Sequence, residues 1–275
     1  MEKKRILFVS QEIKPFLPNT EMSNAARMIP QGVQESGKEI RVFMPRYGVI
    51  NERRHQLHEV IRLSGMNLVI NDVDYPLIIK VASIPTARMQ VYFIDNEEYF
   101  NRKGLYKDEK EVEYADNDER SMFFCKGVLE TVKKLGWKPD AIHCHGWMTA
   151  LMPLYLKEIY KDDPHFADIK IVYSLYDNEF NNNWDEGFVE KLKFEGFSDE
   201  AIDLIKEGDC LSLNKAAMKY ADGVMVGEET VNEELLAFYE DLEKHKMEVG
   251  SDEIQPKIIS EFFDKVIEDE EALIQ

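Results

Sequence analysis

Short apolar runs rich in β-branched residues alternate with helix-like patterns along this chain, and this alternation limits the fold more than any other feature. The runs are RILFVS, EIRVFM, PLIIKVAS, MQVYFID, AIHCH, IKIVYSL and DGVMVG. Several are continuously apolar, as is typical of strands buried on both faces of a parallel sheet. The alternation predicts an α/β fold with a doubly wound, mostly parallel, Rossmann-like sheet.

One part of the chain departs from this alternation. Residues 67–84 and 88–95 form two strand-like stretches in succession, with Asn71 and Asp72 at a turn inside the first. They predict a small antiparallel β insertion in the sheet.

Three segments between the runs have helical patterns. Residues 22–37 end in a glycine, as helices often do. Residues 116–136 start with Asp and Asn as expected caps and carry an apolar stripe that includes Phe124 and Val128. Residues 147–160 follow AIHCH directly and complete the pattern.

We divide the chain into a Rossmann-like domain at residues 1–245 and a linker with an acidic amphipathic helix at residues 246–275. The helix starts at Pro256, and its apolar residues Ile259, Phe262, Phe263 and Val266 recur at roughly helical spacing. We expect this apolar face to pack on the domain. With MEVGSD before it as a linker, docking on a partner is the alternative.

Charge and cysteine content narrow the classes of function. The formal net charge is −19, which disfavours nucleic acid and anionic membrane surfaces as partners. The chain has neither a signal-peptide core nor an apolar run of membrane-spanning length. Cys125, Cys144 and Cys210 form no CxxC pair, which is typical of a reduced cytoplasmic protein and not of a disulfide framework or a structural zinc site.

The turn after the first strand is the first candidate site. In many α/β proteins this turn binds phosphate through glycine-opened backbone N–H groups at a helix N-terminus. Here the turn from Ser10 to Thr20 has no glycine, two prolines (Pro15 and Pro18) and a glutamate, Glu12. It is therefore either a phosphate-binding turn that has lost its function or a turn of another kind.

His143 and His145 are the second candidate. They lie on one side of a strand at its C-terminal end, where ligands of open α/β sheets bind. No third ligand accompanies them at a metal-site spacing, so we expect a ligand-facing or structural role, without a metal or a cofactor. The sequence has no GxSxG, P-loop or HExxH motif, and its abundant carboxylates show no distinct acid/base pair.

Four segments occur in one order: PRYG, FIDNEEYFNRKGLY, DNDERSMFF and HCHGWMTALMPLYLK. With them the chain resembles, from Arg5 to about Leu235, the N-terminal half of bacterial glycogen and starch synthases. LNKAAMKYADGVMV, which contains Lys215, resembles a later segment of the same half. The resemblance implies one half of a GT-B fold, in a family that transfers glucose with retention from ADP- or UDP-glucose to an α-1,4-glucan.

The same resemblance implies that this half mainly receives the glucan, while a second domain holds most of the donor. This chain covers the first domain, and no second βαβ array follows it. We therefore expect the cations and the carboxylate that the family's C-terminal domain supplies to be missing. Such electrostatic groups usually provide the largest part of catalysis.

The first turn departs from the family's pattern, which resembles ExxPFxKxGGLxDV. The family's donor-binding lysine falls on Pro18, its two glycines fall on Thr20 and Glu21, and its aspartate falls on Asn24. Pro18 supplies neither a cation nor a backbone N–H donor. The β-carbons of Thr20 and Glu21 keep the backbone away from a diphosphate. A carboxylate such as Glu21 at ~4 Å from a phosphate costs roughly 1 kcal/mol in water and about 4 kcal/mol at an intermediate dielectric. The resemblance therefore implies a degenerate donor loop.

At other positions, too, some residues depart from the family's pattern and others match it. The family's donor-contacting histidine falls on Tyr176 and its neighbouring asparagine on Asp177. An aspartate of the family becomes Gly146, and a VSP-like turn becomes GEE, with Glu228 and Glu229. His143, His145, Trp147, Thr149 and Lys215 match. Of these positions we take His145, Trp147, Tyr176, Asp177 and Lys215 as candidate ligand-binding residues, with a structural role as the alternative.

These departures predict a synthase-like domain that is not catalytic by itself and binds an α-glucan or a protein. The binding surface would lie around residues 19–24, His145 and residues 176–183. Within NEFNNNW, asparagines and a tryptophan suit sugar hydroxyls and stacking, but they also suit an ordinary polar loop. The first alternative is a half-enzyme completed in trans by a separate donor-binding domain, and the second is a transferase with a less anionic donor.

Overall fold

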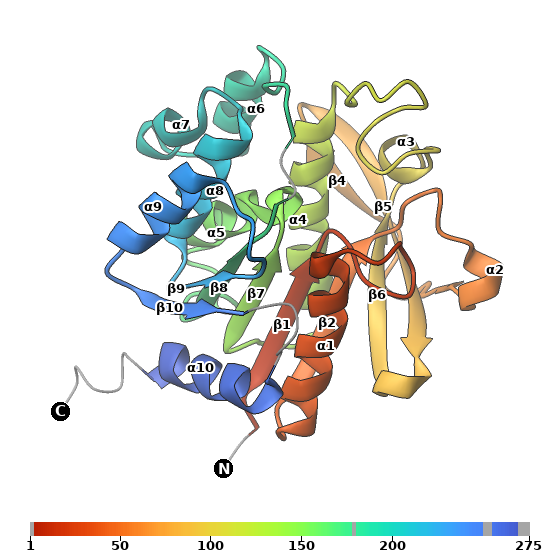
Figure 1. The fold of residues 1–275 in the computed structure, drawn as a ribbon. Helices are drawn as coiled ribbons and strands as arrows, with labels where there is room; N and C mark the ends of the chain where they lie inside the picture. Colours follow the sequence, from red (N-terminus) through yellow and green to blue (C-terminus); the bar gives the residue numbers. More distant parts are fainter. Residues whose placement is uncertain (1–2, 178–179, 250–254, 269–275) are drawn as a thin grey trace.

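The computed structural model describes residues 3–177, 180–249 and 255–268, and these residues form an α/β fold around one mixed sheet (Figure 1). The strands are β1 (Arg5–Ser10), β2 (Glu39–Pro45), β3 (His58–Glu59), β4 (Met66–Ile70), β5 (Val73–Ile84), β6 (Met89–Asp95), β7 (Ala141–His145), β8 (Lys170–Leu175), β9 (Gly223–Val226) and β10 (His245–Glu248). The α-helices are α1 (Glu21–Glu35), α2 (Glu52–His55), α3 (Glu97–Phe100), α4 (Asn117–Lys134), α5 (Leu151–Leu154), α6 (Phe188–Glu195), α7 (Asp199–Ile205), α8 (Cys210–Tyr220), α9 (Glu233–Asp241) and α10 (Pro256–Glu268). Helical turns of other pitch are η1 (Pro85–Ala87), η2 (Trp147–Thr149) and η3 (Tyr155–Ile159).

The strand order confirms the doubly wound, mostly parallel sheet. The order is β10-β9-β8-β7-β1-β2-β6-β5-β3, with β4 paired to β5 beside this path. From β10 to β6 every pair of neighbours is parallel. The chain moves from β1 towards β6 and then returns to the other side of β1 with β7. The order therefore reverses between β1 and β7, and a ligand of such a sheet is expected outside the carboxyl ends of these two strands.

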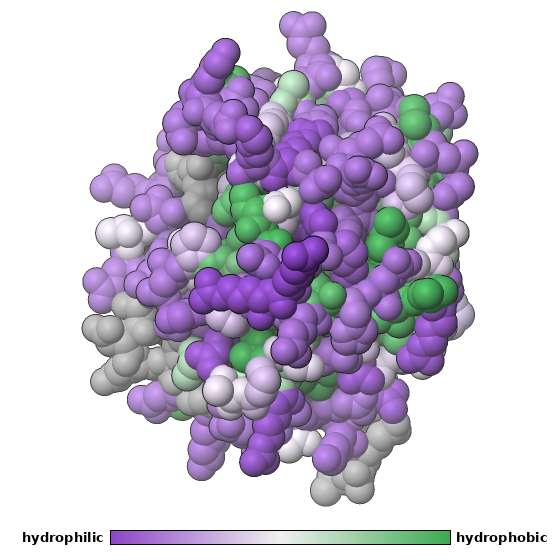
Figure 2. All heavy atoms as spheres, turned by 90° about the vertical axis from the view of Figure 1, so that its right-hand side faces the viewer, coloured by the Kyte–Doolittle hydropathy of each residue, from purple (hydrophilic) through white to green (hydrophobic). Residues whose placement is uncertain are grey.

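The antiparallel insertion is also confirmed. β4 and β5 form a hairpin whose turn residues Asn71 and Asp72 both have positive φ, as a tight hairpin turn requires. β5 is antiparallel to β6 and so joins the hairpin to the parallel strands. On the side of the molecule that lies to the right in Figure 1, the surface is mostly polar, with apolar side chains in separate patches (Figure 2).

Two predicted helices differ in detail from the structure. Asp116 is the N-cap of α4, but its side chain makes no capping bond, because it forms an ion pair with Arg102 instead. The stretch 147–160 is helical with a changing pitch, first as η2, then as α5 around Pro153, and then as the π-helical η3.

α10 packs beside α1 on one face of the sheet, while α4, α5 and α8 follow one another across the other face (Figure 1). The predicted apolar stripe of α10 is buried against the domain, with Phe263 fully buried beside Phe8 and His143. Lys38 anchors α10 by donating to Ser260 Oγ (2.7 Å) and Asp264 Oδ2 (2.8 Å). The boundary that we placed between residues 245 and 246 falls inside β10, and residues 250–254 and 269–275 of the predicted linker and helix lie outside the described residues.

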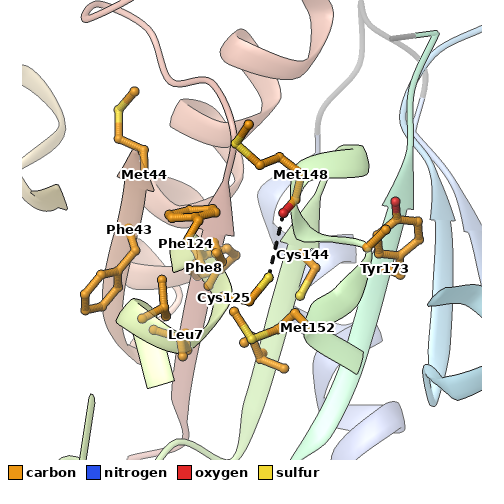
Figure 3. Close-up of a cluster of buried hydrophobic side chains, with 14 of the residues drawn as sticks. Leu7, Phe8, Phe43, Met44, Phe124, Cys125, Cys144, Met148, Met152 and Tyr173 are labelled. Carbon is orange, nitrogen blue, oxygen red and sulfur yellow. Dashed lines mark hydrogen bonds between the residues drawn. The ribbon is translucent and has the colours of Figure 1, made fainter. Parts of the chain in front are cut away.

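Buried side chains from both sides of the strand-order reversal form the central core (Figure 3). Cys125 on α4 and Cys144 on β7 lie in it as free thiols, and Cys125 Sγ donates to the Met148 carbonyl (3.7 Å). Among the described helices, none has the length and apolarity to cross a membrane.

Candidate functional site

The reversal point between β1 and β7 is spanned by the protein's own side chains. Ser10 pairs with His145 at the carboxyl ends of the two strands, and the Gln11 N–H donates to the His145 carbonyl (3.3 Å). The fully buried Gln11 side chain accepts from the Met148 N–H (3.0 Å) and donates to the Tyr106 hydroxyl (3.0 Å). The amide group thus connects β1 to the turn after β7 where an open crevice would lie.

The segment from Ser10 to Asn24, which we call the donor turn, holds its helix N-terminus with internal groups. Thr20 is the N-cap of α1: its Oγ1 accepts from the Ser23 N–H (3.0 Å), and Ser23 Oγ accepts from the Thr20 N–H (2.9 Å). The Thr20 hydroxyl also donates to Glu12 Oε2 (2.9 Å). These bonds engage N–H groups that a phosphate would otherwise use at the start of α1.

Glu12 adds a buried carboxyl group to this turn. Its Oε1 accepts from the Tyr106 hydroxyl (3.1 Å). Burial raises the pKa of Glu12, and the hydrogen bonds from Thr20 and Tyr106 partly oppose that rise.

The other substituted positions of the donor turn lie near its surface. Pro18 and Glu21 are exposed, and the Pro18 carbonyl accepts from Ser23 Oγ (2.9 Å). Asn24 is half-buried within the first turns of α1. Lys14 brings one cation to the turn, and its Nζ donates to Asn19 Oδ1 (3.0 Å). Glu21 places its carboxylate in the first turn of α1, where it already complements the positive helix end.

Tyr176 closes the carboxyl ends of β7, β8 and β9. It is buried directly after β8, and its hydroxyl lies 2.8 Å from His145 Nδ1. The ring lies over the backbone of Gly227, so closely that a β-carbon there would be 2.4 Å from the nearest ring atom. Gly227 is therefore the residue that makes room for Tyr176 at the neighbouring strand end.

Carboxylates surround this closed end. Glu228 accepts from the Asp177 N–H, and burial raises the pKa of Glu228. The negative charges of Asp177, Glu21 and Glu12 raise that pKa further, which places all four acidic groups within electrostatic reach of one another. A diphosphate at this edge would meet like charge from the ends of several strands.

The two candidate histidines are both fully buried, with ring centroids 3.9 Å apart. His143 Nε2 lies 2.7 Å from Ser174 Oγ, and its ring packs against Phe263 of α10. Burial lowers the pKa of His145 to about 3 and that of His143 well below its usual value, so both rings are neutral at pH 7. Within the described ranges no cluster of three or more His, Cys, Asp or Glu side chains has the arrangement of a metal site.

Trp147 belongs to a buried aromatic cluster. It packs edge-on against Tyr106, Phe180 and Trp184, with ring centroids 5.2, 5.0 and 6.2 Å away. Phe180 and Trp184 stack on each other, and Trp184 is only 8% exposed. The tryptophan of NEFNNNW therefore packs inward and offers no open face to a sugar ring.

Two asparagines of NEFNNNW are bound by Glu113, which is not part of the aromatic cluster. The N–H groups of Asn181 and Asn182 both donate to the carboxylate of Glu113 (2.9 and 3.0 Å). Asn178 and Glu179, which belong to the predicted binding surface, lie outside the described residues.

Lys215 lines a groove to which neither His145 nor Tyr176 contributes. The groove lies between α7, α8 and α9, and Lys215 on α8 pairs with Glu234 on α9 (3.5 Å). Thr149 is the last residue of η2, and its hydroxyl donates to the Gly146 carbonyl before Trp147 (2.7 Å).

Residues 93–120, which we call the motif block, have a buried cation at their centre. The fully buried Arg120 guanidinium donates to the carbonyls of Tyr99 (2.8 Å) and Leu105 (2.7 Å) and to Asn117 Oδ1 (2.6 Å). It also lies 5.4 Å from the centre of the Phe100 ring. The matched sequence DNDER thus has a structural role in this chain.

Sequence reasoning missed Gln11, Tyr106 and Gly227 as parts of this site. Gln11 could have been found from its position directly after the first strand. Tyr106 could have been found because it lies in the segment GLYK, at the end of a family-like motif. Gly227 stands in the segment GEE that was compared with the family's VSP-like turn, but its role depends on the ring of Tyr176 after a different strand.

Comparison with known proteins places these observations in a family context. A family model described as the starch synthase catalytic domain matches residues 5–247. The glycogen synthase of Chlorobium limicola is 36% identical over 221 residues, which cover 79% of this chain and 44% of the relative. The glycogen synthase of Chlorobaculum tepidum is 35% identical over 237 residues, covering 84% of this chain and 47% of the relative. The chain thus spans about half the length of these curated relatives or slightly less.

A solved structure shows the same fold. The catalytic domain of starch synthase IV from Arabidopsis thaliana, bound to ADP and acarbose, superposes with a TM-score of 0.67 at 17% sequence identity. The match covers 82% of this chain and 45% of the Arabidopsis chain.

Proposed function

The chain belongs to the starch synthase catalytic domain family, and on this premise we propose that it is a glycosyltransferase-like domain that does not transfer glucose by itself. It acts instead as a binding module for an α-glucan or a protein, in the manner of a pseudoenzyme. Its place is the cytoplasm, which the free, buried thiols of Cys125 and Cys144 support.

The observation that carries this proposal is the internal bonding of the donor turn. The Thr20 hydroxyl lies between the Glu12 carboxylate and the Ser23 N–H, so the start of α1 is already complemented. Exposed Glu21 adds like charge for any diphosphate, and Pro18 supplies no cation. The closure of the neighbouring strand ends by Tyr176 supports the same conclusion.

Calorimetric titration of the purified chain with ADP-glucose and UDP-glucose tests the proposal. We expect no saturable binding up to about millimolar concentration. Micromolar binding by the unmodified chain would contradict the proposal and make an enzymatic function the one to pursue.

A variant with the family's residues in the donor turn sharpens this experiment. Pro18→Lys, Thr20→Gly and Glu21→Gly together restore a cation and close backbone approach, so we expect the triple variant to bind ADP-glucose more tightly than the unmodified chain. The matched control is Glu190→Gln with Asp203→Asn, which changes the net charge equally at two exposed sites. An equal gain in the control would mean that net charge alone governs donor binding.

Calorimetry also distinguishes an α-glucan ligand from a protein ligand. Maltooligosaccharide binding without nucleotide-sugar binding would identify a glucan-binding module. Because Trp147 and Trp184 are buried, we expect any glucan contact to come from polar groups at the strand ends and not from these rings. Absence of glucan binding would leave a protein partner as the ligand.

A half-enzyme completed in trans is the second candidate, and the intact motif block around Arg120 favours it. The acceptor-side scaffold of the family keeps its buried network, as a domain working with a separate donor-binding domain would require. The isolated C-terminal half of the Chlorobium limicola glycogen synthase, mixed with this chain, provides the test. Incorporation of labelled glucose into glycogen by the mixture, but by neither part alone, would establish completion in trans.

A further inference from the structure

Tyr176 and His145 form a closed pair at the carboxyl ends of β8 and β7. The Tyr176 hydroxyl lies 2.8 Å from His145 Nδ1, and the two rings stack with their centroids 5.8 Å apart. His145 is fully buried and ends β7, whereas Tyr176 lies one residue beyond β8. The last pairing between β8 and β9 is at Leu175, so the phenol of Tyr176 can turn away without breaking a strand pairing.

The closed pair offers no compensation for a positive charge on the imidazole. His145 Nε2 is buried and has no hydrogen-bond partner among the described residues. The neighbouring His143 ring lies 3.9 Å away, centre to centre, and its Nε2 lies 2.7 Å from Ser174 Oγ. Burial accordingly lowers the pKa of His145 from 6.5 to about 3. A proton on His145 therefore costs free energy as long as the pair is closed.

The titratable groups around the pair come from all the neighbouring elements and are mostly carboxylates. Those that act on Tyr176, His143 or Glu228 are Glu12 after β1, Glu21 on α1, Asp177 after β8, Glu228 after β9, and His145 itself on β7. Glu229, Glu240 and Glu248 line one pocket with Glu228. An imidazolium that leaves the closed pair would therefore meet opposite charge at the strand ends.

We propose that Tyr176 is an acid-opened gate over the carboxyl ends of β7 and β8. At neutral pH the neutral imidazole and the phenol stay together, and the gate is closed. Below about pH 6.5, where an exposed histidine takes up a proton, protonation of His145 favours a minor form in which Tyr176 has turned away. In that form the imidazolium contacts water and the surrounding carboxylates. The closed form remains the major one.

This inference deepens the proposed function, because the gate covers the strand ends at which we expect a glucan to bind. Opening makes His145 and the Ser174 hydroxyl accessible to a ligand. The test uses no ligand, so the two ideas can fail separately. A protein without glucan affinity can still have the gate, and a protein without the gate can still bind a glucan.

Amide hydrogen exchange of the full chain, followed by NMR, tests the gate. The probe is the Asp177 N–H, which donates to Glu228 directly after Tyr176, and the reference is the Phe8 N–H in the centre of β1. After division by the intrinsic exchange rate, the opening constant at Asp177 should rise about tenfold from pH 7.5 to pH 5.5, because the neutral fraction of an exposed histidine falls from about 0.9 to about 0.1.

The reference amide separates the gate from global unfolding. We expect Phe8 to open far less often than Asp177 at both pH values, because a local opening leaves the centre of the sheet intact. Equal opening constants at the two amides would mean that only the whole protein opens. That result, or an unchanged opening constant at Asp177, would overturn the proposal.

A histidine variant identifies the group that takes up the proton. His145→Asn does not titrate in this range, so the tenfold rise should disappear. The matched control is His58→Asn, which removes an exposed histidine of the β insertion and should keep the rise. A rise that persists in His145→Asn would mean that Glu228, the acceptor of the probe N–H, takes up the proton, and it would overturn the proposal.

A tyrosine variant tests what holds the gate closed. Tyr176→Phe keeps the ring against Gly227 but lacks the hydroxyl, so the opening constant at pH 7.5 should rise about fivefold. The control Tyr220→Phe removes a partly buried hydroxyl that donates to Glu158 and should leave the constant unchanged. If Tyr176→Phe opens no more often than the unmodified chain, the hydroxyl does not hold the gate, and the proposal is wrong.

Discussion

The motif block and the donor turn both carry family-like sequence, but they differ in what their side chains do. In the motif block the matched Arg120 is fully buried and donates to three separate acceptors. In the donor turn the positions that depart from the family pattern, Pro18, Thr20 and Glu21, are exposed. A buried polar side chain with several partners is costly to replace, whereas an exposed turn residue is not. The fold of this chain therefore depends more on the buried side chains of the motif block than on the exposed positions of the donor turn.

The largest expected effect is in the motif block. Arg120→Met removes three hydrogen-bond donations inside the core and leaves their acceptors buried, so we expect the free energy of unfolding to fall by about 3–5 kcal/mol. Urea unfolding followed by circular dichroism measures this. Arg102→Met is the control: its ion pair with Asp116 is partly exposed, and we expect a loss of about 1 kcal/mol. A smaller loss for Arg120→Met than for Arg102→Met would reject the structural role of the block.

The next effect concerns the closure of the strand ends. Gly227→Ala places a methyl group against the Tyr176 ring and should lower the free energy of unfolding by about 1–3 kcal/mol. In a Tyr176→Ala background this cost should vanish, because the ring is gone. Additive effects in the double-mutant cycle would show that the two residues do not form one closed unit.

A pH dependence of similar or smaller size follows from the buried histidine. Burial lowers the pKa of His145 from 6.5 to about 3, so below pH 6.5 the unfolded chain binds a proton that the native chain does not. The contribution of His145 is therefore complete above pH 6.5 and is lost as the pH falls. Between pH 7 and pH 5.5 the unmodified chain should lose about 1 kcal/mol more unfolding free energy than His145→Asn. Identical pH profiles of the two proteins would mean that His145 accepts its proton in the native state.

The smallest effect is expected in the donor turn. Thr20→Ala removes the N-cap of α1 and should cost about 1 kcal/mol, whereas Thr20→Gly should cost only a few tenths. Thermal unfolding of both variants checks this. A loss as large as that of Arg120→Met would remove the contrast between the two regions, because it would make the donor turn as important to the fold as the motif block.

Local pattern predicted the fold because buried parallel strands and amphipathic helices leave a direct mark on the sequence. The turn at Asn71 and Asp72 and the buried stripe of α10 were both visible in this way. β10 was missed because its sequence, HKME, is that of a polar edge strand and not of an apolar run.

The site was less predictable, since the burial and orientation of its side chains depend on contacts between segments far apart in the sequence. His145 and Trp147 stood at the expected strand end, but their burial depends on Tyr176, which follows another strand, and on the aromatic residues of the loop after it. Lys215 matched a family segment, yet its position on α8 faces the groove and not the strand ends. Spacing along the chain therefore located the elements, and only tertiary contacts showed which way the side chains pointed.

The pairing of α10 with α1 has a consequence for how this protein is made. Lys38 and its acceptor Asp264 are 226 residues apart, so a ribosome must synthesise the whole stretch between them before α10 can pack beside α1. Until then Phe8 and the side chains around it lack the cover that Phe263 provides. Contacts of such long sequence separation slow folding, because the chain loses the entropy of the long loop before the native contacts can compensate for that loss. The nascent chain should therefore depend on chaperones most strongly just before α10 emerges.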